Sequence, residues 1–266
     1  MSALACTINY LPSWKNTMRN PSLHWSDLKN IGESPAYYRH RLDNPHESAA
    51  MQFGTCVHRL VLGGDPPVVF DGATRRGKAW DAFEAANPGA LIVTAKELDR
   101  AAQCAKAVLS DPVAAPLLRG RREEAWATEL YGRPCASRGI DVLGDGFIAD
   151  LKTARTVKPA RFVKAALAMG YHAQLAFYRA AARKLGHAVN ACHIIGVESV
   201  APFQVTVMSL TERTLEQGER LNTLWLERLA ACEAADEWPG YVQSPVEVDV
   251  EESTELDFGD DDEESA

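Results

Sequence analysis

The chain has 266 residues, of which 46% are hydrophobic, so a substantial core is available and a wholly disordered chain is excluded. No run of about 18 apolar residues is present, and the N-terminus lacks the basic start and long apolar stretch of a secretory signal, so neither a membrane span nor export is expected. The six cysteines are scattered without a Cys-x-x-Cys pair, which is typical of a reduced cytoplasmic environment.

Charge is distributed unevenly along the chain. The formal net charge is −8, but residues 247–266 hold eleven acidic residues and no basic one, which leaves +3 for residues 1–246. A mildly basic body with an acidic end is compatible with a nucleic-acid partner. We expect a single domain over 1–246 and a solvated, disordered tail over 247–266; a nucleic-acid mimic or docking segment is the alternative for the tail.

The N-terminal half is predicted to be helical. Ser26 and Ser34 are suitable N-caps, and Pro35 fits the first helical position after Ser34. His58 lies beside an apolar stripe at helical spacing, where an ordinary packed histidine is the simplest interpretation. No pattern is assigned to residues 1–21 and 68–93, and helices are expected near Ser26, from Ser34 to Asp43, over 48–62 and over 95–109.

From Glu124 onward the apolar pattern changes to a period of two, which indicates strands. Arg119, Arg121 and Arg122 are placed in the loop before the first of them. A helix–helix–strand–strand–helix order follows the first three strands. The predicted strands cover 124–131, 135–143, 147–152, 189–198 and 202–209, and the predicted helices cover 158–169, 171–185 and 211–236.

A hairpin between the second and third strands brings acidic residues together. Asp145-Gly146 is a strong two-residue turn, and counting outward from it places Asp141 opposite Asp150 with Cβ atoms about 5 Å apart. Lys152 follows two residues after Asp150 and therefore lies on the same face. Like charges in this arrangement repel, so the pattern favours a divalent cation held between the two carboxylates.

Several residues outside the hairpin are candidates for contact with DNA or the reacting groups. Arg75 and Arg76 precede aromatic residues, and Lys158 and Arg161 begin a basic row on one helix face, so each pair can contact phosphate. A solvated helix face is the more common origin of such basic residues and is the alternative for both pairs. Gln174 and Tyr178 share a helix face four residues apart, for which ordinary helix packing is the alternative.

The ordered set of these motifs resembles the PD-(D/E)XK nucleases, and within them the RecE-type exonucleases (exodeoxyribonuclease VIII). The resemblance covers most of the chain, and each motif alone is of low specificity. It is carried by Ser26-Asp27-Leu28, Ser34-Pro35-Ala36-Tyr37-Tyr38, Phe53-Gly54-Thr55-Cys56-Val57-His58, Asp141, Asp150-Leu151-Lys152-Thr153, Gln174-x-x-x-Tyr178 and Trp238-Pro239-Gly240-Tyr241.

This resemblance implies an α/β fold, a mixed sheet flanked by helices with a restriction-endonuclease-like core. It implies a Mg²⁺-dependent 5′-to-3′ exonuclease that acts on linear double-stranded DNA and leaves 3′ single strands for an annealing protein, within a ring-like homo-oligomer of a bacteriophage recombination system. Mn²⁺ is expected to substitute, because imidazole is a softer ligand than Mg²⁺ prefers.

The resemblance also implies roles for individual residues. His58, Asp141, Asp150 and the Leu151 carbonyl hold the metal, and Lys152 orients or helps to deprotonate the attacking water. Glu124 supports the site, with Glu123 and Glu129 as competing candidates, and Gln174 and Tyr178 position the substrate strand or the water. Arg138 contacts DNA, although its spacing to Asp141 is one residue longer than the family pattern.

Other functions within and outside the nucleases are also considered. A PD-(D/E)XK endonuclease shares the same core. A DNA-binding scaffold of the same fold without catalysis is a second alternative, against which stands the presence of Asp141, Asp150 and Lys152 together. An annealing protein would not need opposed carboxylates. A nuclease with an iron–sulfur cluster is rejected, because only Cys232 follows Cys192.

Overall fold

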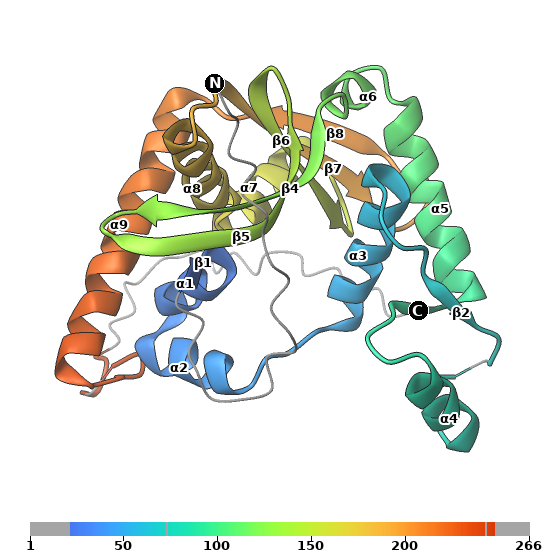
Figure 1. Ribbon diagram of the computed structural model, residues 1–266, viewed down its shortest axis with the longest axis horizontal. Helices are drawn as coiled ribbons and strands as arrows, with labels where there is room; N and C mark the ends of the chain where they lie inside the picture. Colours follow the sequence, from blue (N-terminus) through green and yellow to red (C-terminus); the bar gives the residue numbers. More distant parts are fainter. Residues whose placement is uncertain (1–21, 73, 243, 248–266) are drawn as a thin grey trace, which may run out of the picture.

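The computed structural model of this protein describes residues 22–72, 74–242 and 244–247. At its centre lies a mixed six-stranded sheet, with helices packed against it (Figure 1). This confirms the predicted fold class. The predictions of an irregular segment over 1–21 and of a disordered tail lie outside the described residues, except for Glu247.

Helices account for much of the described chain and begin and end close to the predicted positions. They are α1 (Trp25–Glu33), α2 (Pro35–Asp43), α3 (Ala49–Leu62), α4 (Lys78–Ala86), α5 (Ala95–Ser110), α6 (Ala114–Leu117), α7 (Pro159–Ala168), α8 (Tyr171–Lys184) and α9 (Glu212–Ala235).

The strands fall into the central sheet and a separate two-stranded sheet. They are β1 (Leu23–His24), β2 (Val68–Phe70), β3 (Ile92–Thr94), β4 (Arg121–Leu130), β5 (Arg133–Leu143), β6 (Gly146–Ala154), β7 (Val189–Glu198) and β8 (Val205–Ser209).

The differences from the predicted elements are the two helices α4 and α6, which no predicted helix covers, and several short or shifted strands. β2 and β3 pair in parallel across the segment 68–93, and each has three residues, too few to show a period of two. β1 has only two residues and is likewise too short to show a period of two. β4 begins at Arg121, because pairing of Arg121 with Leu143 and of Arg122 with Val142 extends the strand into the predicted loop.

Capping side chains fix most of the predicted helix starts. The Ser34 hydroxyl accepts a hydrogen bond from the Tyr37 amide, and Ser48 accepts one from Met51. Thr94 and Glu97 form a capping box at the start of α5. The prediction of Ser26 as an N-cap is wrong, because α1 already begins at Trp25 and its N-cap, His24, makes no side-chain capping bond.

Sheet pairing fixes which side chains share a face. β5 and β6 are antiparallel, with Val142 opposite Ala149 and Leu143 opposite Ile148. Leu143 and Ile148 belong to the core that includes α8, whereas Val142 and Ala149 belong to the core formed with α3 and α5. Strand alternation therefore puts Asp141, Asp150 and Lys152 on the α8 side of the sheet.

Helix α8 is held firmly against α9. Asn222 donates a hydrogen bond from Nδ2 to the Ala173 carbonyl (2.8 Å) and accepts one at Oδ1 from Trp25 Nε1 (3.1 Å). The guanidinium of the buried Arg179 pairs with Glu212 (2.7 Å) and Glu219 (2.9 Å) across the same interface. These contacts fix the position of the helix that carries the Gln174 and Tyr178 motif.

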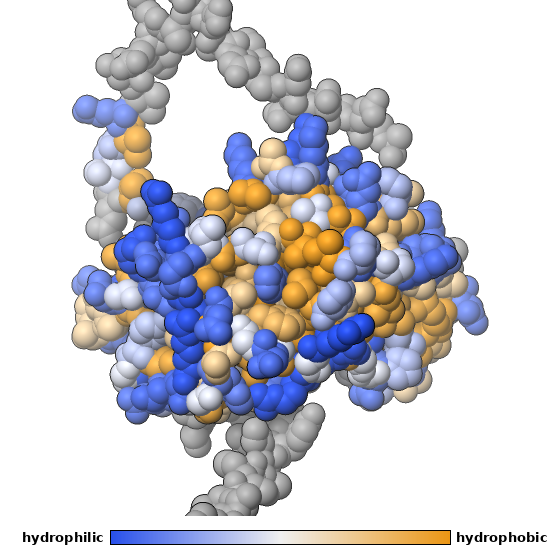
Figure 2. All heavy atoms as spheres, turned by 90° about the horizontal axis from the view of Figure 1, so that it is seen from above, coloured by the Kyte–Doolittle hydropathy of each residue, from blue (hydrophilic) through white to orange (hydrophobic). Residues whose placement is uncertain are grey.

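One face of the described part of the molecule carries an apolar area. Viewed from above, apolar side chains gather at the centre of the face and hydrophilic ones surround them (Figure 2). Leu109, at the end of α5, and Val113, just before α6, are among the exposed large apolar residues. The five described cysteines are free and buried, and none of the described helices is long and apolar enough to cross a membrane.

We predict that Gly218→Ala destabilises the protein. An added Cβ would lie 2.5 Å from the His172 carbonyl oxygen and 2.9 Å from Ala173 Cα, and these backbone atoms can yield only if α8 and α9 move apart. Overpacking of this kind costs about 1–3 kcal/mol. Chemical denaturation measures the loss, with Gly240→Ala as the control because no atom lies within 4 Å of its added Cβ. Equal stability of the two variants would contradict the prediction.

Candidate active site

An ion pair on β6 forms the interior part of the site. The Lys152 Nζ lies 2.5 Å from Oδ2 of Asp150, whose side chain is almost fully buried. Burial raises the pKa of Asp150, Lys152 opposes this shift and Asp141 adds to it. Burial lowers the pKa of Lys152, but the carboxylates of Asp150 and Asp141 outweigh it and keep the ammonium charged.

Asp141 sits where β5 separates from β6. Its Oδ2 accepts a hydrogen bond from the Leu151 amide (2.7 Å) and lies 3.6 Å from Nδ1 of His58. The other ring nitrogen of His58, Nε2, lies 2.8 Å from the Leu151 carbonyl oxygen. Helix α3 therefore brings His58 to the backbone of β6, the strand of the Asp-x-Lys motif. The three predicted metal ligands His58, Asp141 and the Leu151 carbonyl lie together at this point.

Glu123 completes a group of possible metal ligands with His58 and Asp141. One ligand atom from each of the three lies within 4.8 Å of the others. Glu123 lies on β4 between Arg122, which pairs with Val142, and Glu124, which pairs with Ile140, so its position in the ladder is opposite Asp141. Burial raises the pKa of Glu123, and the Asp141 carboxylate raises it further.

The predicted pairing of Asp141 with Asp150 in the ladder is not formed. The β5–β6 ladder stops after Val142 and Ala149, one residue before these two acids. The amide of the next residue, Leu151, bonds to the side chain of Asp141 instead of a backbone carbonyl. The carboxylate directly across from Asp141 thus comes from Glu123 on β4, while Asp150 lies on the same face of the sheet beside Lys152.

Glu123 has an unusual backbone that depends on a glycine. Its φ is 51°, a left-handed conformation that costs a residue with a Cβ about 1–2 kcal/mol. A Cβ on Gly139 would lie 2.9 Å from Glu123 Oε2 and 3.1 Å from its Cα. Gly139 therefore leaves the space that Glu123 occupies. Gly139 is one of the two residues between Arg138 and Asp141, where this sequence is one residue longer than the family pattern.

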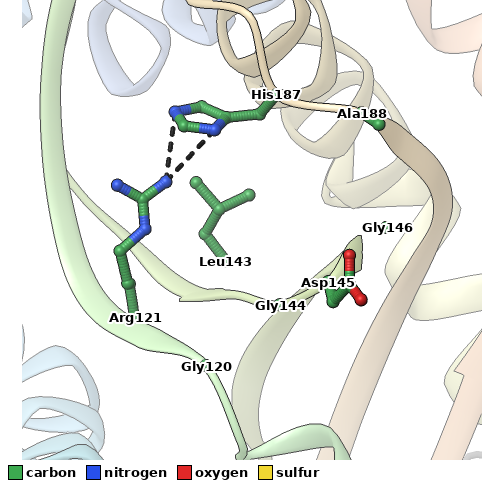
Figure 3. Close-up of a pocket in the computed structure, with 8 residues that line it drawn as sticks. All are labelled: Gly120, Arg121, Leu143, Gly144, Asp145, Gly146, His187 and Ala188. Atoms are coloured by element: carbon green, nitrogen blue, oxygen red, sulfur yellow. Dashed lines mark hydrogen bonds between the residues drawn. The ribbon is translucent and has the colours of Figure 1, made fainter.

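The structure corrects the choice of acid on β4, because Glu124 faces away from this group. Its Oε1 accepts a hydrogen bond from Arg121 Nη1 (2.9 Å), and Arg121 Nη2 lies 3.1–3.2 Å from the ring nitrogens of His187. Arg121 and His187 line a separate pocket of about 390 Å³ beside the Gly144–Gly146 turn (Figure 3). Neighbouring strand residues point to opposite faces, so only one of the two acids can join His58.

Gln174 and Tyr178 lie on α8 as the motif predicts. Gln174 Nε2 donates a hydrogen bond to the Tyr178 hydroxyl (3.2 Å), which also accepts a longer one from Ser137 (3.4 Å). Burial raises the pKa of Tyr178 despite these two bonds, and the charges of Asp150 and Lys152 also act on it. The pair therefore forms a neutral hydrogen-bonding group near the Asp150–Lys152 ion pair.

The predicted DNA-binding residues have different surroundings. Arg75 is wrong as an exposed DNA contact, because it is half-buried and bonds to Gln52 (2.7 Å) and Glu97 (2.6 Å). These bonds tie α3 to the start of α5 and engage both terminal nitrogens of the Arg75 guanidinium. The remaining predicted residues are exposed, and their role stays a prediction: Arg76, Arg138, Lys158 and Arg161.

The donor set suits a hard divalent cation. Carboxylate oxygens predominate, with one imidazole and one carbonyl, which are ligands of Mg²⁺ and Mn²⁺. Oδ2 of Asp150 is buried, and its partner in the protein is the Lys152 ammonium, with which it forms an ion pair. Burial decreases from Asp150 through Asp141 and His58 to the exposed Glu123, which leaves one side of the group open to a polymer.

Similarity to known proteins agrees with this geometry. The family described as "PDDEXK-like domain of unknown function (DUF3799)" matches residues 24–245 of the chain. A crystal structure described as "Putative exonuclease" from Eubacterium rectale has a TM-score of 0.64 and 16% sequence identity, and the match covers 85% of this chain and 91% of that one. At this identity the likeness concerns the fold. No curated protein matches the chain.

We predict that Glu123→Gln weakens Mn²⁺ binding by at least tenfold, whereas Glu124→Gln changes it less than twofold. The first substitution removes a charged oxygen from the group with His58 and Asp141, and the second removes only a partner of Arg121. Loss of one site residue commonly costs about 10- to 100-fold in metal affinity. Titration calorimetry measures both variants, and a larger effect of Glu124→Gln would contradict the assignment.

Proposed function

Since the chain belongs to the family of PDDEXK-like domains, we propose that it is a nuclease that hydrolyses DNA phosphodiester bonds with a divalent metal ion. The observation that carries the proposal is the meeting of His58, Glu123 and Asp141 within 4.8 Å beside the Asp150–Lys152 ion pair. Neither core packing nor surface solvation requires three acids, an imidazole and a lysine at one break in a sheet.

The residues that would hold the metal ion are His58, Glu123, Asp141 and Asp150, with the Leu151 carbonyl as a further ligand. When bound, such an ion stabilises charge on phosphate oxygens and lowers the pKa of bound water. We propose Mg²⁺ as the physiological ion and Mn²⁺ as a substitute, because oxygen ligands outnumber the one nitrogen ligand.

The other residues at the site act on the phosphate and the attacking water. Lys152 is held charged by Asp150 and Asp141, so it offsets negative charge that develops on the phosphate and orients the water through a donated hydrogen bond. Gln174 keeps a side-chain donor and acceptor beside the Tyr178 hydroxyl. We assign this pair the positioning of the substrate strand, since Tyr178 remains neutral near physiological pH.

We further propose that the enzyme is a 5′-to-3′ exonuclease that acts on linear double-stranded DNA and leaves 3′ overhangs for single-strand annealing. The resemblance to RecE-type exonucleases supports this direction, and the structural similarity to the Eubacterium rectale protein, described as "Putative exonuclease", supports an exonuclease. A double-stranded DNA end and an annealing protein are the proposed partners. The apolar area of Figure 2 supports the proposal of a ring-like homo-oligomer, since such areas mark protein contacts.

Linear duplex DNA labelled at either the 5′ or the 3′ end, incubated with Mg²⁺ or Mn²⁺, tests the proposal. Mononucleotides released from the 5′ ends are the expected result. Discrete internal cuts would support the endonuclease alternative and overturn the exonuclease proposal. Absence of cleavage with every metal ion would support a DNA-binding scaffold and overturn the nuclease proposal.

We predict that Lys152→Ala lowers the cleavage rate on the order of 10²-fold or more while duplex binding is retained. The variant loses the ammonium that offsets charge near the phosphate, an effect of the size seen when one stabilising donor is removed. Rapid-quench kinetics and fluorescence anisotropy measure rate and binding. Lys184→Ala, at the exposed far end of α8, serves as the control. Cleavage by Lys152→Ala at the wild-type rate would refute the assigned role.

A further inference from the structure

Lys152 has a second partner besides Asp150. Its Nζ lies 4.9 Å from the centroid of the Tyr171 ring, within the range of a cation–π interaction. The Lys152 side chain is 18% exposed, and such contacts are stronger where water is largely removed. The ammonium thus lies between a carboxylate on its own strand and an aromatic ring on α8.

The ring of Tyr171 is held in place by the start of its helix. Gly170, directly before it, has φ of 73°, which favours glycine. A Cβ at Gly170 would lie 3.4 Å from the Trp25 ring and 3.6 Å from the Trp225 ring. Two tryptophans from α1 and α9 therefore enclose the turn that begins α8, and the first residue of that helix projects toward Lys152.

The two partners of Lys152 do not respond alike to a bound cation. Asp150 is among the residues that would hold the metal ion, so its carboxylate would have to serve both the ion and Lys152. The aromatic face of Tyr171 is a poor ligand for a hard cation and keeps its contact with the ammonium. The ring is therefore the partner that would not be drawn into binding the metal ion.

We propose that Tyr171 is a positioning residue, whose ring face fixes the Lys152 ammonium in the orientation needed for cleavage. The inference rests on the proposed nuclease function and extends the site by a residue outside the Asp-x-Lys and Gln-x-x-x-Tyr motifs. Its electrostatic part depends on the electron-rich face of the ring, over which the Lys152 ammonium lies, and not on the hydroxyl group. A purely space-filling role would depend on ring volume alone.

A series of substitutions at position 171 separates these roles. Tyr171→Phe is expected to keep kcat within about twofold, since the ring face is retained. Replacement of Tyr171 by mono-, di- and trifluorophenylalanine lowers the electron density of the ring at nearly constant volume, and kcat is expected to fall stepwise, to about a tenth of the Phe value for the trifluoro residue. KM for duplex DNA is expected to stay within about twofold throughout the series.

A flat kcat across the fluorinated series would overturn the inference, as would a loss confined to KM. Tyr171→Leu is expected to lower kcat about tenfold, and the near-isosteric fluorinated residues keep the test valid if the leucine variant does not fold. Trp238→Leu is the control, because it removes a contact of the same kind, with Arg39 at 5.9 Å, elsewhere in the molecule. It is expected to leave kcat unchanged; a loss equal to that of Tyr171→Leu would overturn the inference.

Failure of the inference is distinguishable from failure of the proposed function. If the wild-type protein cleaves DNA and Lys152→Ala does not, a flat series at position 171 counts against Tyr171 alone. If the wild-type protein cleaves no DNA with Mg²⁺ or Mn²⁺, the proposed function fails and the positioning role fails with it.

Discussion

Repulsion between carboxylates crowded at one break in the sheet is the constraint on which the site depends. Glu123 and Asp141 lie across from each other on β4 and β5, and Asp150 lies buried on the next strand. Like charges at such positions are destabilising. The protein offsets part of this cost with Lys152 and with the Leu151 amide, but the Asp141 carboxylate still raises the pKa of both Glu123 and Asp150, so the compensation is incomplete. A divalent cation would supply the remainder, which links metal binding to stability at this point.

The surrounding fold holds these acids in place against their repulsion. β6 is paired in parallel with β7 over its length, so the backbone of Asp150 and Lys152 is fixed in the middle of the sheet. Helix α3 adds His58 from one side. Helix α8 adds Tyr171, Gln174 and Tyr178 from the other, and its buried bonds to α9 prevent it from moving away. A preorganised group of this kind stabilises developing charge without rearrangement during the reaction.

Backbone strain occurs at the same break in the sheet, in strand β4. The left-handed conformation of Glu123 and the irregular β4–β5 register after Glu124 are unfavourable on their own, and both occur where β5 also leaves β6. Bulges next to active sites commonly redirect a side chain. Here the irregularity, together with the space left by Gly139, turns the Glu123 carboxylate toward His58 and Asp141. Replacing the acid, therefore, would remove a ligand and relieve the repulsion at the same time.

The sequence by itself determined the elements and the chemistry of the site. Caps at Ser34 and Thr94, the Asp145-Gly146 turn and the alternation along β6 are local features, so the hairpin and the common face of Asp141, Asp150 and Lys152 could be predicted from neighbours in the chain. Only the tertiary structure decided which acid faces Asp141, that Arg75 is occupied by Gln52 and Glu97, and that Tyr171 meets Lys152. Each of these depends on contacts between distant segments and on a one-residue irregularity in β4, and a one-residue shift moves a side chain to the other face of a strand.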